Sequence, residues 1–204
     1  MYQLIQIIKR SQFIIDDFFP PKTLHEKITK PFDKFVYYFA TTLFFTGLIC
    51  QIFEIRNFDN TIDGTRLFWT AGSIGIIIAI VITAILKVSF PSVYYESKRR
   101  YTVYFGIFLG SFLLIPAVVG FINHYYADNN KICKRYVIKR KGIGGSRSKE
   151  YFIHLTLDNN KDERFSIGKT RYENFSEGEE IELCMKKGKL GFDYVTEFNK
   201  VNQW

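Results

Sequence analysis

Three long apolar windows restrict what this chain can fold into. Residues 36–53 and 103–122 contain no charged side chain, and residues 67–90 contain one, Lys87, near the end of the window. A helix of about 18 to 24 residues is about 27 to 36 Å long, which is enough to cross the hydrocarbon core of a bilayer. We therefore predict three transmembrane helices at about 36–53, 67–90 and 103–122, in a transmembrane domain over residues 36–126.

Most charged residues lie outside these windows, so the average composition combines an apolar part of the chain with a highly charged part. Charged residues make up 24% of the chain, and aromatic residues make up 18%. Such an aromatic content is typical of helices that are anchored at the two surfaces of a membrane.

The N-terminal segment has its own pattern. Apolar side chains in residues 1–19 fall on one half of a helix and polar ones on the other, and Pro20-Pro21 ends the pattern. We predict an amphipathic helix in the membrane interface with its linker over residues 1–35; the alternative is a helix that docks on the soluble domain or on a partner. The start lacks a small-residue cleavage site, so we expect no cleaved signal peptide.

Two small-residue faces lie on the second and third predicted spans. Gly106 and Gly110 are four residues apart and are followed by Ser111, while Ala71 and Gly75 form a similar pair. Small residues at this spacing let helix backbones approach closely. We predict helix packing through these faces, either within one chain or between chains.

After the third window, apolar and polar residues alternate with a period of two. Tyr151, Ile153 and Leu155 alternate with Phe152 and His154, as in a strand with one buried face. Further strands are predicted at about 135–141, 164–168, 180–186 and 190–197, with a helical turn within 169–176. We predict an α+β membrane protein in which residues 131–198 form a five-stranded β-barrel, OB-like or SH3-like.

The stretch from Tyr172 through Gly178 to Phe192 resembles small β-barrels appended to bacterial membrane proteins. This resemblance covers about a third of the chain and implies no particular catalytic or binding residue.

The formal net charge of +8 comes largely from clusters beside the spans. Basic residues in such positions bind lipid headgroups and set topology, so we expect membrane lipids as partners and do not expect nucleic acid. The predicted headgroup or anion contacts are Lys98, Arg99, Arg100, Lys134, Arg135, Lys139, Arg140 and Lys141.

The number of basic residues does not decide the orientation of the chain in the membrane, because eight Lys and Arg residues flank the predicted spans on each side of it. A basic tail without a signal sequence is hard to translocate, which favours a cytoplasmic N-terminus and an exported β domain. We expect a bacterial inner-membrane protein with this orientation. In an exported domain Cys133 and Cys184 can form a disulfide, because the first and fourth strands of an OB barrel are neighbours; the alternative is two buried thiols.

The sequence offers no constellation typical of catalysis, metal binding or transport. Glu54, Lys87 and His124 lie near span ends, where we expect anchors or ion-pair partners rather than proton relays. The cysteines lack metal-ligand spacing, and the three histidines have no evident nucleophile and orienting partner. We predict no cofactor, no metal site and no catalytic residue.

These observations favour a non-enzymatic membrane-anchored interaction or assembly module. Such a module is an accessory subunit of a membrane complex or an immunity-type protein, and its β-barrel binds a partner or lipid headgroups. The alternative is a ligand-sensing membrane effector whose helices oligomerise into a pore through the glycine faces.

Overall fold

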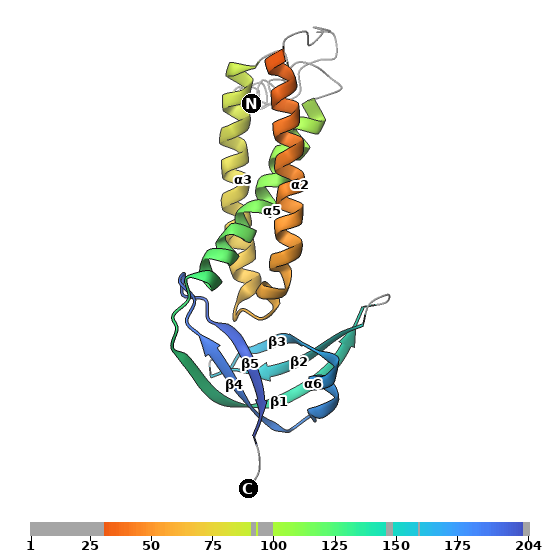
Figure 1. Cartoon of the computed structure of the whole chain (residues 1–204), viewed down its shortest axis with the longest axis vertical. Helices are drawn as coiled ribbons and strands as arrows, with labels where there is room; N and C mark the ends of the chain where they lie inside the picture. Colours follow the sequence, from red (N-terminus) through yellow and green to blue (C-terminus); the bar gives the residue numbers. More distant parts are fainter. Residues whose placement is uncertain (1–30, 91–92, 94–99, 146–148, 159, 202–204) are drawn as a thin grey trace, which may run out of the picture.

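The computed structural model of the chain describes residues 31–90, 93, 100–145, 149–158 and 160–201 (Figure 1). The amphipathic helix predicted over residues 1–19 lies outside these residues. Three long helices stand on a small β domain, and the C-terminal end of the last strand lies on the side of this domain remote from the helices.

The three apolar windows form helices α2 (Pro31–Asp59), α3 (Gly64–Ser89) and α5 (Arg100–Tyr125). Each is long and apolar enough to cross a membrane. All three begin before the predicted windows, and α2 and α5 also end after them, because a helix that leaves the hydrocarbon core can continue through polar residues at the membrane surface. Large apolar side chains such as Ile77 and Val88 point outward and are 61% and 82% exposed, as expected for a surface in contact with lipid.

Helix α5 lies between the other two, and most helix contacts in the bundle involve it. Small residues allow this approach: a Cβ atom placed on Gly106 would lie 2.6 Å from the carbonyl oxygen of Ala40. The bundle is therefore held by close backbone packing as well as by large side chains.

The β domain is a single antiparallel sheet with the strand order β3-β2-β1-β4-β5. Its strands are β1 (Lys131–Gly144), β2 (Glu150–Thr156), β3 (Asp162–Ile167), β4 (Glu180–Lys186) and β5 (Tyr194–Lys200), and the short helix α6 (Lys169–Asn174) follows β3. The first half of β1 pairs with β4 and its second half with β2. This long bent strand, which is irregular between Ile138 and Arg140, curls the sheet into a half-barrel.

The fold confirms the predicted class: three long apolar helices are followed by a curled five-stranded sheet. The order fits the OB-like alternative, because β4 lies beside β1 and a helix lies between β3 and β4. The largest differences from the predicted strand boundaries are in β1 and β5. Strand β1 is longer at both ends, and β5 begins at Tyr194 rather than near residue 190, because residues 188–191 form a turn in which Gly191 has a φ of +86°.

The inner face of the half-barrel is filled with apolar side chains. Alternate residues of the five strands, including Ile153, Phe165, Ile181 and Leu183, are completely buried there. Among the described strands, β3 and β5 are the edges of the sheet and do not pair with each other. The open side between these two edges faces the helices (Figure 1).

Candidate functional site at the junction of helices and sheet

The turn between α2 and α3 enters the open side of the half-barrel. The carbonyl of Asn60 accepts a hydrogen bond of 2.8 Å from the N–H of Val195, and the N–H of Ile62 donates one of 2.8 Å to Asp193. Thr61 and Tyr194 form an antiparallel bridge between these bonds. The turn therefore extends the β5 edge by a short paired segment.

The same turn also reaches the opposite edge, β3. The N–H of Asp63 donates to Oε1 of Glu163 at 3.4 Å, and the carboxylate of Asp63 forms an ion pair with Lys161. The Ile62 side chain packs against the core of the half-barrel. The turn therefore pairs with backbone at the start of the β5 edge and contacts the Glu163 and Lys161 side chains at the β3 edge.

A polar cluster lies beside the turn, where α2, α5 and β5 meet. Nε2 of His124 lies 2.9 Å from Oγ1 of Thr61, and Nδ1 lies 3.6 Å from Oε2 of Glu54. The ring of His124 also contacts the ring of Tyr194, with 4.6 Å between centroids. The Glu54 and His124 side chains are only 12% and 11% exposed, and Glu54 also accepts a hydrogen bond of 3.0 Å from Nδ2 of Asn57.

The hydroxyl of Thr61 fixes the proton position on the imidazole. A hydroxyl has one hydrogen, and Thr61 donates it to the carbonyl oxygen of Asn57 at 2.7 Å. Nε2 of His124 must therefore donate to Thr61. The other ring nitrogen, Nδ1, faces the carboxylate of Glu54 at 3.6 Å, which is longer than a hydrogen bond.

Thr61, His124 and Glu54 thus stand in the order hydroxyl, imidazole, carboxylate, which is also the order of a nucleophile, its base and an orienting acid. Two features argue against catalysis here. The Thr61 hydrogen points to a backbone carbonyl instead of to the imidazole, and Thr61 is only 3% exposed. The geometry fits a structural link between the helices and the sheet.

Asn123 makes a second link on the same side of α5. Its side chain, which is completely buried, donates to the carbonyl of Phe192 at 2.8 Å and accepts from the N–H of Leu190 at 3.0 Å. Its own carbonyl accepts from the N–H of Lys189 at 3.1 Å. A Cβ on Gly188 would collide with Asn123 and Phe192, so this close approach needs glycine. The β4–β5 loop is therefore fastened to the end of α5.

The predicted packing faces lie inside this chain. Gly106 and Gly110 pack against the backbone of α2, near Ala40 and near Leu43 and Phe44 respectively. Gly75 packs against the backbone of Ser111, and Ala71 is buried on the same side of α3. These small residues thus bring the three helices of one bundle together.

The residues predicted to contact lipid headgroups lie in different parts of the structure. Lys98 and Arg99 lie outside the described residues. Arg100 is 4% exposed, and its guanidinium lies 4.8 Å from the centre of the Tyr101 ring. A headgroup contact of this residue stays a prediction. The remaining basic residues of this group lie on β1: Lys134, Arg135, Lys139, Arg140 and Lys141.

Several of the β1 residues have partners within the domain. Lys134 forms an ion pair with Asp158, Lys139 forms one with Asp162, and Lys141 lies over the Tyr172 ring. The hydrogen bond with Lys134 holds the pKa of Asp158 below its ordinary value.

Cys133 and Cys184 are directly opposite each other on β1 and β4 and form a disulfide. Oxidation joins the two sulfur atoms, so they are not thiolate ligands, although the Glu182 carboxylate lies nearby. Cys50 in α2 is a free thiol.

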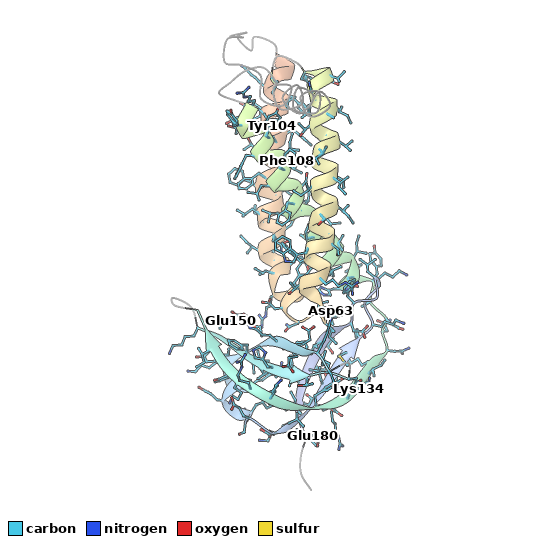
Figure 2. All side chains as sticks on the ribbon, turned by 180° about the vertical axis from the view of Figure 1, so that it is seen from behind. Asp63, Tyr104, Phe108, Lys134, Glu150 and Glu180 are labelled. Atoms are coloured by element: carbon cyan, nitrogen blue, oxygen red, sulfur yellow. A yellow bond between two sulfur atoms is a disulfide. The ribbon has the colours of Figure 1, made fainter. Side chains whose placement is uncertain are left out.

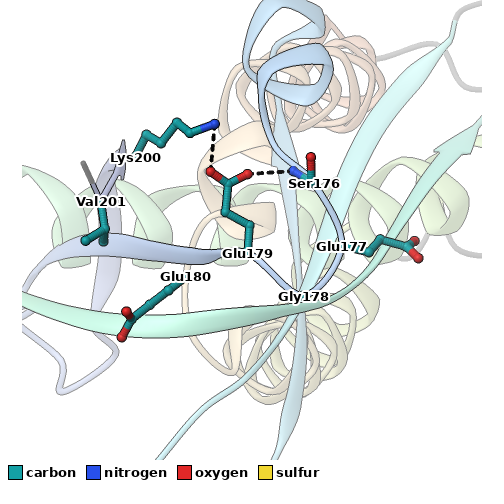
Figure 3. A pocket seen from close by; sticks show the side chains of 7 residues that line it. All are labelled: Ser176, Glu177, Gly178, Glu179, Glu180, Lys200 and Val201. Carbon is teal, nitrogen blue, oxygen red and sulfur yellow. Dashed lines mark hydrogen bonds and ion pairs between the residues drawn. The ribbon is translucent and has the colours of Figure 1, made fainter. Parts of the chain in front are cut away.

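An open hollow of about 650 Å³ lies at the base of β4 (Figure 3). Its carboxylates hold the loop in place: Glu179 accepts a hydrogen bond of 2.8 Å from the Ser176 N–H and pairs with Lys200, and Glu177 accepts one from the Lys141 N–H. The ion pair with Lys200 lowers the pKa of Glu179. These interactions stabilise the loop that precedes β4.

Sequence reasoning placed Glu54 and His124 correctly as polar groups at span ends with an ion-pair role, but it missed Thr61, Ile62 and Asn123. One signal was present: Asn123 and His124 follow directly on an uncharged window. Comparison of the chain with protein-family models, curated proteins and solved structures gave no match.

Proposed function

We propose that this chain is a non-enzymatic, membrane-anchored interaction module that presents its β domain to a protein partner at a fixed orientation to the bilayer. The observation that carries this proposal is the junction. The α2–α3 turn bonds to β5 through Asn60 and Ile62 and to β3 through Asp63, while Asn123 fastens the β4–β5 loop. A domain tied at three places cannot swing freely on a linker, and a fixed orientation is useful for assembly with a second protein.

The side of the β domain remote from the helices is the surface offered to the partner. Glu180 lies on this side, whereas Asp63 lies at the helix base (Figure 2). Val137 is paired with Glu180 across β1 and β4 and is 54% exposed, beside the neighbouring pair Arg135 and Glu182. An exposed apolar side chain among opposite charges has the mixed character of a transient protein interface.

We propose a bacterial inner-membrane location, with a cytoplasmic N-terminus and an exported β domain. The Cys133–Cys184 disulfide supports this orientation, because disulfides persist in the periplasm and are rare in the cytosol. The basic N-terminal tail supports it as well. An accessory subunit of a membrane complex or an immunity-type protein fits this description.

The alternative, a pore assembled through the glycine faces, has less support, because Gly106, Gly110 and Gly75 pack against backbone of their own chain. A second chain would have to displace these contacts.

Photo-crosslinking in native membranes tests the interaction module. A photoreactive amino acid is introduced at Val137 or Glu180, and at Ile77 as a lipid-facing control. We expect one discrete protein adduct from the two β-domain positions and none from Ile77. If Val137 and Glu180 give no protein adduct, and the chain elutes as a lone monomer from mild detergent, the proposal is wrong.

A further inference from the structure

Three potential metal ligands lie together on the outer face of β1 and β4. Cys133 is directly opposite Cys184, and Glu182 is two residues before Cys184, so it shares the same face of β4. The two sulfur atoms and a carboxylate oxygen of Glu182 all lie within 4.8 Å of one another. The two cysteines are separated by 51 residues in the sequence. Antiparallel pairing, rather than a short motif, therefore brings these ligands together.

The three side chains differ in their exposure to solvent. Cys133 is exposed, Glu182 is half-buried and Cys184 is only 3% exposed. Two side chains of β5 hold Cys184 in place: Thr196 donates a hydrogen bond of 3.0 Å to its carbonyl oxygen, and Nδ2 of Asn199 donates to its sulfur atom at 3.9 Å. One ligand is thus fixed by the neighbouring strand, while the other two are accessible from solvent.

Basic side chains flank the three ligands on the same face of the sheet. Lys131 and Lys186 are directly opposite each other, two residues from the cysteine pair, and Arg135 is directly opposite Glu182. Lys131 also pairs with Glu197 on β5. Two thiolates and one carboxylate carry three negative charges, of which a divalent cation compensates two. The basic neighbours compensate the remaining one.

The disulfide prevents metal binding as long as it is intact, because a thiolate and not a disulfide sulfur is the metal ligand. A dithiol reductant removes this obstacle. One thiolate of the dithiol attacks the exposed sulfur of Cys133, the S–S bond breaks and Cys184 leaves; the second thiol of the reductant then displaces Cys133 from the mixed disulfide. The reductant loses two electrons and two protons and becomes a disulfide, and the two cysteines gain them as thiols.

We propose that Cys133 and Cys184, once reduced, bind a zinc ion together with Glu182. A zinc–sulfur bond of about 2.3 Å and a tetrahedral angle place the two sulfur atoms about 3.8 Å apart. Directly opposite strand residues provide this spacing, because their Cβ atoms are about 4.5 to 5.5 Å apart. The fourth position is left for water. Thiolates favour zinc over magnesium and calcium, which take oxygen ligands, and binding releases the two thiol protons.

This inference goes beyond the proposed function and does not depend on it. In an oxidising compartment the disulfide is the resting state, so the metal site opens only where a dithiol reduces it. The site adjoins the surface offered to the partner, because Glu180, which lies on the side of the domain remote from the helices, is two residues before Glu182 (Figure 2).

Cobalt titration of the full chain in detergent tests this site. The chain carries Cys50→Ser, so that Cys133 and Cys184 are its only cysteines. It is reduced with a phosphine and separated from the reductant without oxygen. We expect one Co²⁺ per reduced chain, with the absorption of tetrahedral cobalt bound to thiolates, and we expect Zn²⁺ to displace it. The oxidised chain should show no such absorption.

Two variants separate the carboxylate ligand from a general effect of charge. Glu182→Gln should weaken zinc binding by about tenfold or more, because it removes one ligand. Glu180→Gln, which changes the charge on the same strand face two residues away, should leave zinc binding unchanged. Equal zinc affinity of the Glu182 variant and the reduced parent chain would overturn the assignment of this ligand.

A second measurement is the thermal unfolding of the reduced chain. Zn²⁺ should raise the midpoint of unfolding, because a ligand that binds the folded state stabilises it, whereas Mg²⁺ at the same concentration should not. A reduced chain that shows neither cobalt–thiolate absorption nor stabilisation by Zn²⁺ would overturn the proposal. The readouts concern metal binding by the isolated chain, so their result is independent of the crosslinking experiment on Val137 and Glu180.

Discussion

His124 on α5 and Glu54 on α2 join the ends of two membrane-spanning helices directly above the β domain, with 3.6 Å between Nδ1 and Oε2. The other ring nitrogen of His124 reaches Thr61 in the α2–α3 turn. One imidazole therefore connects two helices and the turn that covers the open side of the sheet. Both side chains are largely buried, so neither can readily exchange its partner for water.

A double-mutant cycle should show strong coupling between these residues. Glu54→Gln and His124→Ala each remove one partner of this contact, while the double variant removes both; Glu54 keeps the hydrogen bond from Nδ2 of Asn57, and His124 keeps its contact with Thr61. We expect a coupling energy of about 1 to 3 kcal/mol in the free energy of unfolding, measured by circular dichroism in detergent. The pair Lys169 and Glu173, exposed on α6, should show coupling of less than about 0.5 kcal/mol. Additive effects at Glu54 and His124 would contradict the structural role given to this contact.

Asn123→Ala should loosen the β4–β5 loop. The substitution removes the partners of the Leu190 N–H and the Phe192 carbonyl, and each buried group left without a partner costs about 1 to 3 kcal/mol. Amide hydrogen exchange of residues 187–195 should accelerate, and the free energy of unfolding should fall. Asn129→Ala, at an exposed position beyond α5, is the control and should change neither quantity. Unchanged exchange in the Asn123 variant would show that the loop is held by other contacts.

Gly106→Leu and Gly110→Leu should destabilise the single chain. At both positions even a Cβ atom would lie within 3 Å of backbone atoms of α2, so the helices must separate. We expect a loss of at least about 2 kcal/mol, seen as a lower midpoint of thermal unfolding in detergent. Ala84→Leu, a small-to-large change on the exposed surface of α3, should be nearly neutral. A variant of normal stability with an altered oligomeric state would show instead that these glycines pack between chains.

The architecture could be predicted because its signals are local. An uncharged window of about 20 residues predicts a spanning helix, and alternation such as that of Tyr151, Ile153 and Leu155 predicts a strand with one buried face. Each of these patterns can be recognised without knowing what the segment packs against. The strand order was predicted less directly, from the position of the helical turn between the third and fourth strands.

The junction could not be predicted in this way. Thr61 pairs with Tyr194, and Asn123 bonds to Phe192, across long sequence separations that no periodic pattern marks. Ile62 lies between the first two predicted spans, yet it packs against the core of the sheet. Such contacts depend on where the helices emerge above the half-barrel, which follows from the whole fold.

Glu163→Gln should stabilise the protein near neutral pH. Burial, reinforced by the nearby Asp63 carboxylate, raises the pKa of Glu163 above its ordinary value of 4.5, while the Asp63 N–H opposes the shift. A raised pKa in the folded state means that the contribution to stability is complete below about pH 4.5 and is lost as the pH rises through the folded value. Removing the ionisation should therefore raise the free energy of unfolding at pH 7, with no benefit at pH 4.

Glu197→Gln provides a control of opposite sign. The hydrogen bond with Lys131 lowers the pKa of Glu197, so its contribution is present above its ordinary pKa of 4.5 and is lost as the pH falls through the folded value. This variant should be less stable than the parent protein at pH 7. Chemical denaturation at several pH values between 4 and 8 gives both comparisons, and a Glu163 variant that is less stable at pH 7 would contradict the burial argument.

The Cys133–Cys184 disulfide should govern the stability of the β domain. It closes a loop with a sequence separation of 51 residues, for which the chain-entropy model gives about 4 kcal/mol. Reduction, or the variant Cys133→Ser with Cys184→Ser, should lower the free energy of unfolding by up to about that amount, while Cys50→Ser should leave it unchanged. In intact cells a membrane-impermeant maleimide should label Cys133 and Cys184 only after a reductant is added from outside. Labelling without reductant would show that the two thiols are free, and labelling that requires cell lysis would place the domain in the cytoplasm, which would remove the main support for its export.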